Sequence, residues 1–174
     1  MAIAVLGGLL LVTGALAGAV LSLRRRFVVV DVEGNSMEPT IGFHDRLVVR
    51  RVRPTALKVG DIVVFERPYR AVPGGPWAWR PIAPERRWMI KRLAALPGDP
   101  APSDVPDGGG TVPTAVVAVL GDNRDASVDS RAFGYVPLDR VLGVAVRRYG
   151  QDGRVTVENR PAGSWQASPY RPGP

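Results

Sequence analysis

The stretch "RFVVVDVEGNSMEPTIGFHDRLVVRRV", residues 26–52, carries the clearest fold signal in the chain. Two runs rich in Val, 26–32 and 46–52, flank a segment that contains Gly, Asn, Ser and Pro. β-Branched residues favour strands, whereas those four residue types favour turns. The pattern predicts two short strands and, at the end of the first, a turn that holds Ser36.

The same kind of segment recurs through the rest of the chain. Further Val- and Ile-rich stretches bounded by Gly, Pro or Asp lie at 61–68, 87–96, 114–122, 140–149 and 154–159. No long amphipathic helical pattern is present between them. The sequence therefore predicts a mostly β, compact barrel-like or sandwich-like domain over 27–160. The Pro-rich tail, 161–174, is predicted to be disordered.

A long uncharged run precedes this domain. Residues 2–23, "AIAVLGGLLLVTGALAGAVLSL", contain no charged side chain, and as a helix they would extend roughly 33 Å, close to the thickness of bilayer hydrocarbon. A cleavable secretory signal should carry a basic residue before its apolar core, and none is present. The pattern predicts an N-terminal transmembrane helix within residues 1–26, followed at once by Arg24–Arg26.

Composition excludes several classes of site. The chain has no cysteine, which excludes disulfides and thiol catalysis, and its single histidine, His44, makes a metal site improbable. We expect no metal and no cofactor. The net charge of +7 is typical of proteins that bind anionic lipid surfaces or nucleic acid. The basic residues follow no nucleic-acid-binding motif, which favours a membrane and argues against nucleic acid.

Ser36 can act as a nucleophile only if a base lies beside it. The candidates are His44 and the two lysines of the chain, Lys58 and Lys91. His44 lies in a turn-rich segment and would need a buried Asp to complete a triad, so we expect a surface histidine there. Lys58 lies in a polar turn, where solvent keeps an amine charged.

Lys91 lies in the apolar segment "WMIKRLAAL", where alternation would place it on one strand face with Met89 and Leu93. A lysine with the ordinary pKa of about 10.4 has only about one amine in 2,500 neutral at pH 7. Burial in an apolar surround lowers that pKa and turns the amine into a base. The alternative is that Lys91 extends its amine to solvent beside Arg92.

A third segment, "VLGDNRDASVDSRAFGYVP" at 119–137, contains several Asp, Arg and Ser residues. A calcium loop is one possibility, but the interleaved arginines do not match the acidic pattern of an EF-hand. A turn whose Asp and Arg side chains pair with each other, next to an active site, fits the pattern better.

Four motifs in order, "GNSMEPTI", "DRLVV", "KRLAALPGD" and "GDNRDASVDSRAFGYVP", resemble the conserved boxes of type I signal peptidases, of the Gram-positive type. The resemblance covers about residues 27–149 and implies a Ser/Lys peptidase fold. It implies that Ser36 is the nucleophile and Lys91 its general base. It further implies that Ser127 orients the lysine amine, while Asp129 and Arg131 pair to support the site.

The same chemistry suggests which groups meet the substrate. The Ser36 backbone N–H is a natural oxyanion donor, and Gly34 stands two residues earlier, with Asn35 between them, where one branch of the family has a hydroxyl. An extended peptide would add alongside an exposed strand. By the resemblance, its pockets accept small residues at positions −3 and −1. The predicted wall residues are Val30, Val32, Met37 and Met89.

The resulting hypothesis is a membrane-bound hydrolase, a serine endopeptidase that removes signal peptides from preproteins during secretion. It would be a single-pass protein of the plasma membrane with its catalytic domain outside the cytoplasm, although Arg24–Arg26 argue for the opposite orientation by the positive-inside rule. The alternatives are a processing peptidase dedicated to one precursor, an inactive membrane-anchored peptide-binding β-domain, and a self-cleaving repressor-type protein.

Overall fold

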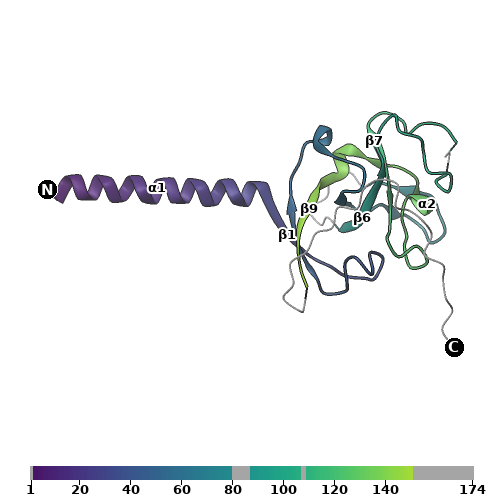
Figure 1. Cartoon of the computed structure of the whole chain (residues 1–174), viewed down its shortest axis with the longest axis horizontal. Coiled ribbons are helices and arrows are strands. Elements are labelled where there is room, and N and C mark those ends of the chain that lie inside the picture. Colours follow the sequence, from purple (N-terminus) through teal and green to yellow (C-terminus); the bar gives the residue numbers. More distant parts are fainter. Residues whose placement is uncertain (1, 80–86, 107–108, 151–174) are drawn as a thin grey trace.

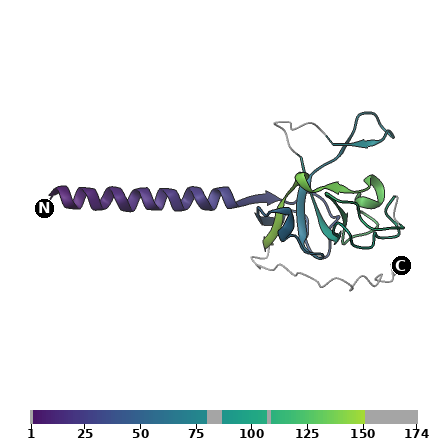
Figure 2. The same ribbon diagram turned by 90° about the horizontal axis from the view of Figure 1, so that it is seen from above.

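The computed structural model describes residues 2–79, 87–106 and 109–150, with side chains from Thr13 onward. Helix α1, Ala2–Arg26, projects from a β-rich body and runs directly into β1, Phe27–Asp31 (Figures 1 and 2). The three arginines of its last turn suit the negative end of the helix dipole. A helix was expected here. Among the described residues, no helix is both long and apolar enough to cross a membrane.

The body is built on one antiparallel sheet of seven strands in the order β1-β2-β9-β3-β6-β7-β8. After β1, its strands are β2 (Arg46–Arg50), β3 (Ile62–Glu66), β6 (Trp88–Ala95), β7 (Val116–Leu120), β8 (Val136–Pro137) and β9 (Val141–Tyr149). A separate hairpin joins β4 (Tyr69–Arg70) to β5 (Trp77–Ala78). Short helices complete the described body: α2 (Ser130–Phe133) and the 3-10 turns Pro54–Ala56 and Leu138–Arg140.

Apolar clusters lie against both faces of this sheet. All five residues of β3 are buried, and successive side chains point to opposite faces of a strand. Val64 accordingly belongs to the cluster that holds Met37, whereas Phe65 belongs to the cluster that holds Leu93. The mostly β prediction is confirmed, and burial on both faces explains why the first four residues of β3, Ile62–Phe65, are all apolar.

Six of the seven expected strand segments contain a strand of the structure. The seventh, 154–159, and the tail, 161–174, lie outside the described residues. The two-residue strands β4, β5 and β8 were not expected. Trp77 and Trp79 place their rings 6.0 Å and 6.5 Å from that of Phe133.

Two strand edges are left open where the functional motifs meet. Strand β1 lies at one edge of the sheet. Strand β6 pairs with β3 along Trp88–Arg92, but its pairing with β7 begins only at Arg92. Within the described residues, Trp88–Lys91 therefore present backbone donors and acceptors that no neighbouring strand uses.

Candidate active site

Ser36 lies in the turn that follows β1. Gly34 adopts φ +110°, a conformation that L side chains rarely adopt, and it lets the chain turn out of the strand. A hydrogen bond then spans the serine: the Asn35 carbonyl, just before it, accepts from the Glu38 N–H, two residues after it, at 3.1 Å. Met37 is buried in the core and fixes the turn from below. The serine is thus held by its neighbours on both sides, with its own side chain half-buried.

Lys91 approaches this serine from β6. Its Nζ lies 2.7 Å from Ser36 Oγ and 3.0 Å from the carbonyl oxygen of Ile90. The residue is only 3% exposed, so the alternative in which its amine reaches solvent is wrong. Met89 and Leu93 contribute to one core cluster, as the alternation predicted.

Burial has a direct chemical consequence for the amine. Desolvation lowers the pKa of Lys91 from its ordinary value of 10.5 to about 8. The negative charges of Asp129 and Asp122 act in the opposite direction, while the positive charge of Arg67 lowers the pKa further. The amine is therefore a usable proton acceptor slightly above neutral pH, which an exposed lysine is not.

Asp129 is the common acceptor of a buried hydrogen-bond network next to the site. Its side chain is fully buried, and it accepts hydrogen bonds from the Gly121 N–H at 2.9 Å and from Ser127 Oγ at 2.8 Å. Arg131 completes the set with an ion pair at 2.8 Å. Burial alone would raise the pKa of Asp129, but the hydrogen bonds from Arg131, Gly121 and Ser127 outweigh it and hold the pKa below its usual range.

The placement of Ser127 differs in detail from the expectation. Its hydroxyl donates to Asp129, and among the described residues no hydrogen bond joins it to Lys91. Asp129 and Arg131 pair with each other, in the arrangement that the resemblance implied. The influence of this group on catalysis stays a prediction.

Four site residues were not singled out from the sequence. The Asn123 backbone N–H donates to the Ser36 carbonyl at 3.0 Å, and its side-chain amide donates to the Asn35 carbonyl at 3.1 Å. Arg92 and Asp122 form a buried ion pair at 2.6 Å. Gly121 lies against Ser36 and Ser127. The sequence offered two signals for these residues: Arg92 directly follows Lys91, and the other three lie within the third motif, 119–137.

Ser36 and Lys91 line a cleft of about 520 Å³ between the two open strand edges. All four predicted wall residues line it: Val30, Val32, Met37 and Met89. Val32 and Met37 are themselves buried. The exposed arginines Arg67 and Arg87 line the cleft as well.

The other candidate bases lie elsewhere. His44 is exposed in a turn, with its ring 3.9 Å from that of Phe43, and Lys58 is exposed. Across the described residues, no group of three or more His, Asp or Glu side chains could hold a metal ion.

Comparison with known proteins decides the family. The family model described as "Signal peptidase, peptidase S26" matches residues 6–103 and 102–149, which is most of the chain. This chain belongs to the S26 signal peptidase family. The family is one of serine endopeptidases, and Ser36 and Lys91 both fall within the matched region.

Individual relatives agree with this membership. The chain is 31% identical over 141 residues to a probable signal peptidase I-2 of Synechocystis sp., an alignment that covers 68% of this chain and 61% of the relative. It is 32% identical to signal peptidase I of Leptolyngbya laminosa, covering 68% and 66%. It is 26% identical to signal peptidase IB of Staphylococcus aureus, covering 78% and 85%. The matched part thus spans about two thirds of the first two relatives.

Proposed function

We propose that this S26 family member is a membrane-attached endopeptidase that removes signal peptides from secreted preproteins. Ser36 serves as the nucleophile and Lys91 as the general base. The observation that carries the proposal is the 2.7 Å approach of Lys91 Nζ to Ser36 Oγ, made by a buried amine whose pKa is lowered to about 8.

The reaction proceeds through an acyl-enzyme. Neutral Lys91 accepts the proton of the Ser36 hydroxyl as Oγ attacks the carbonyl carbon of the scissile bond. The resulting ammonium group then protonates the leaving amine. In the second half, Lys91 takes a proton from water as the water oxygen attacks the ester carbonyl. The bond to Ser36 Oγ then breaks, Lys91 returns the proton to that oxygen, and the signal peptide leaves with a new C-terminal carboxyl group. The hydrogen bond from Nζ to the Ile90 carbonyl orients the amine for these transfers.

The Ser36 backbone N–H is the proposed oxyanion donor. It makes no hydrogen bond to any residue that the structure describes, so it is available to the negative oxygen of the tetrahedral intermediate. The conformation of Gly34 and the Asn123 bond to the Ser36 carbonyl fix the direction of this amide.

Substrate binds as an extended strand in the cleft. The outer edge of β1 and the open edge of Trp88–Lys91 supply backbone partners on both sides. Alternate side chains of such a strand point into the wall made by Val30, Met37 and Met89. This wall is apolar, and by the family resemblance its pockets accept small residues at −1 and −3.

Attachment to a membrane through the N-terminal segment is the remaining part of the proposal. Its support is the uncharged run at 2–23 and the high exposure of the described apolar side chains of α1, such as Leu16, which is 65% exposed. Attachment would place the cleft close to precursors that are themselves held in the membrane, with the catalytic domain on the extracytoplasmic side of the plasma membrane.

The pH dependence tests the base. With a pKa of about 8 for Lys91, the neutral fraction rises about tenfold per pH unit below pH 8 and saturates above about pH 9. We expect kcat/KM for a signal-peptide substrate without titratable side chains near its cleavage site to follow this curve. A rate that keeps rising to pH 10 would indicate a solvated lysine and contradict the proposed base.

Arg67 offers a finer test of the same electrostatics. Its positive charge lowers the pKa of Lys91, so Arg67→Gln is expected to move the pH profile upward. Activity should fall about threefold at pH 7 and change little at pH 10, where the amine is neutral in both proteins. Arg67→Lys should keep the original profile. Arg70→Gln, which removes an exposed charge outside the cleft lining, is the matched control, and an equal shift there would point to net charge.

A further inference from the structure

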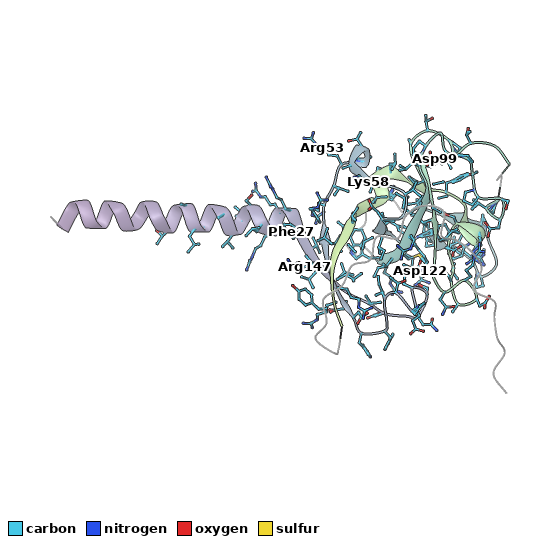
Figure 3. The ribbon with its side chains drawn as sticks, viewed as in Figure 1. Phe27, Arg53, Lys58, Asp99, Asp122 and Arg147 are labelled. Atoms are coloured by element: carbon cyan, nitrogen blue, oxygen red, sulfur yellow. The ribbon has the colours of Figure 1, made fainter. Side chains whose placement is uncertain are left out.

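Seven exposed arginines lie around the junction of α1 with β1 and are called here the arginine collar. Three come from the end of α1, three from the end of β2 and just beyond it, and one from β9: Arg24, Arg25, Arg26, Arg50, Arg51, Arg53 and Arg147. Figure 3 shows Arg53 and Arg147 on either side of Phe27, on the side of the body that faces the helix. The catalytic proposal uses none of them.

Sheet register brings these residues together from distant parts of the chain. Phe27, the first residue after α1, pairs with Arg50, and the Arg51 N–H donates to the Arg26 carbonyl at 2.9 Å. On the other side of β2, Arg147 pairs with Val48. Arg50 is two residues after Val48 on β2, and residues two apart on a strand share a face. Because Arg147 pairs with Val48, Arg50 and Arg147 lie on the same outer face of the sheet.

The collar carries its charge uncompensated. In the described part of the chain, none of the seven forms an ion pair or a side-chain hydrogen bond. Other arginines are paired: Arg46 with Asp31, Arg92 with Asp122 and Arg124 with Asp104. Like charges crowded at one end of a domain repel one another, and an external polyanion would relieve that repulsion.

The helix beside the collar indicates which polyanion fits. Leu16, Leu21 and Leu23 of α1 are 65%, 52% and 57% exposed. A helix with exposed apolar side chains therefore extends from the arginine collar. A phospholipid surface offers both complements, acyl chains for the leucines and phosphates for the arginines. Guanidinium groups bind phosphate oxygens in a bidentate manner. A nucleic acid would satisfy the charges and leave the apolar side chains without a role.

We infer that the arginine collar binds the phosphate groups of an anionic phospholipid surface and so seats the catalytic domain against the membrane. This inference rests on the membrane attachment proposed above and adds a headgroup preference to it. Each arginine near such a surface strengthens binding several-fold, and salt weakens the effect because the attraction is screened.

The test measures partition of the full chain into two kinds of vesicle. One kind is pure phosphatidylcholine, and in the other about a third of the lipid is phosphatidylglycerol, each at about 0.1 M and about 1 M salt. At the lower salt we expect a preference for the anionic vesicles on the order of 100-fold, and at the higher salt a preference close to one.

Substitution then locates the effect. The collar variant Arg50→Gln, Arg51→Gln, Arg53→Gln should lose at least about tenfold of the preference. The matched control Arg46→Gln, Arg70→Gln, Arg124→Gln removes the same charge from exposed arginines outside the collar and should lose less than about threefold. Thermal unfolding of both variants shows whether they fold.

Three results would overturn the inference: equal binding to both vesicles, an equal loss in the control variant, or tighter binding to random-sequence duplex DNA than to anionic vesicles at the same salt. The last would identify a nucleic-acid surface. Failure to bind either vesicle would instead refute membrane attachment itself, and with it the collar inference. Cleavage of a short soluble peptide by the same preparation tests the peptidase proposal separately.

Discussion

Cleavage of a signal-peptide substrate is expected to fall at least about 1,000-fold when Ser36 is replaced by alanine. The variant removes Ser36 Oγ, the proposed nucleophile, while the turn around it keeps its backbone hydrogen bonds. Lys91→Ala is expected to cause a loss of similar size, because Ser36 Oγ lies 2.7 Å from the amine and depends on it for deprotonation. The double variant should be no worse than either single one, since the two residues act as a unit.

Lys91→Arg separates base catalysis from positive charge. A guanidinium remains protonated at any accessible pH, so it can hold a charge near Ser36 but cannot accept the proton. We expect this variant to be inactive up to pH 10, although a wider side chain at a 3% exposed position also strains the packing. The pH series of the wild type therefore remains the cleaner measure of the base.

Matched controls exist for both positions. Lys58→Ala changes the other lysine of the chain, and Ser103→Ala changes an exposed serine; both should cleave at the wild-type rate. Circular dichroism and thermal unfolding show whether each variant is folded. Substantial cleavage by Ser36→Ala, after contaminating proteases are excluded with a second purification, would refute the proposed nucleophile.

The sequence was sufficient to predict the position of the strands that have strong apolar patterns. The segments predicted at 46–52 and 140–149 contain β2 and β9 with shifts of no more than two residues at either end. Strands β4, β5 and β8 have two residues each, too few for alternation to be visible. Helix α2 is one turn long and depends on Asp129, whose side chain accepts a bond from the Arg131 N–H. That cap is recognisable only once the Asp is known to be buried.

The site was predictable in its chemistry and not in its contacts. Lys91 could be chosen over Lys58 because its neighbours are apolar. Its contact with Ser36 joins residues 55 positions apart and depends on how β6 is placed against the turn after β1. No local pattern encodes that distance. The bond from Asn123 to the Ser36 carbonyl is hidden for the same reason, since it links two loops through backbone atoms.

Gly121→Ala is expected to reduce cleavage at least about 100-fold, although residue 121 contributes no reacting group. A Cβ at this position would lie 2.7 Å from the Ser36 carbonyl oxygen and 2.5 Å from Ser127 Cβ, and closer still to Ser127 Oγ. Real Cβ atoms do not approach other atoms so closely, and two of these three neighbours belong to the backbone or lie next to it. The methyl group must therefore push the 121–131 loop away from the nucleophile turn.

The displacement acts on catalysis through two bonds. It pulls the Asn123 N–H from the Ser36 carbonyl, and it moves the Gly121 N–H away from Asp129, whose negative charge faces Lys91. Overpacking of a buried contact costs about 1–3 kcal/mol of unfolding free energy, measurable by urea denaturation. Gly110→Ala is the control, because a Cβ there meets nothing within 4 Å. Wild-type cleavage by folded Gly121→Ala would show that the loop can retreat without moving Ser36. A lowered kcat at nearly unchanged KM would instead show that the contact between this loop and the Ser36 turn holds the nucleophile in place.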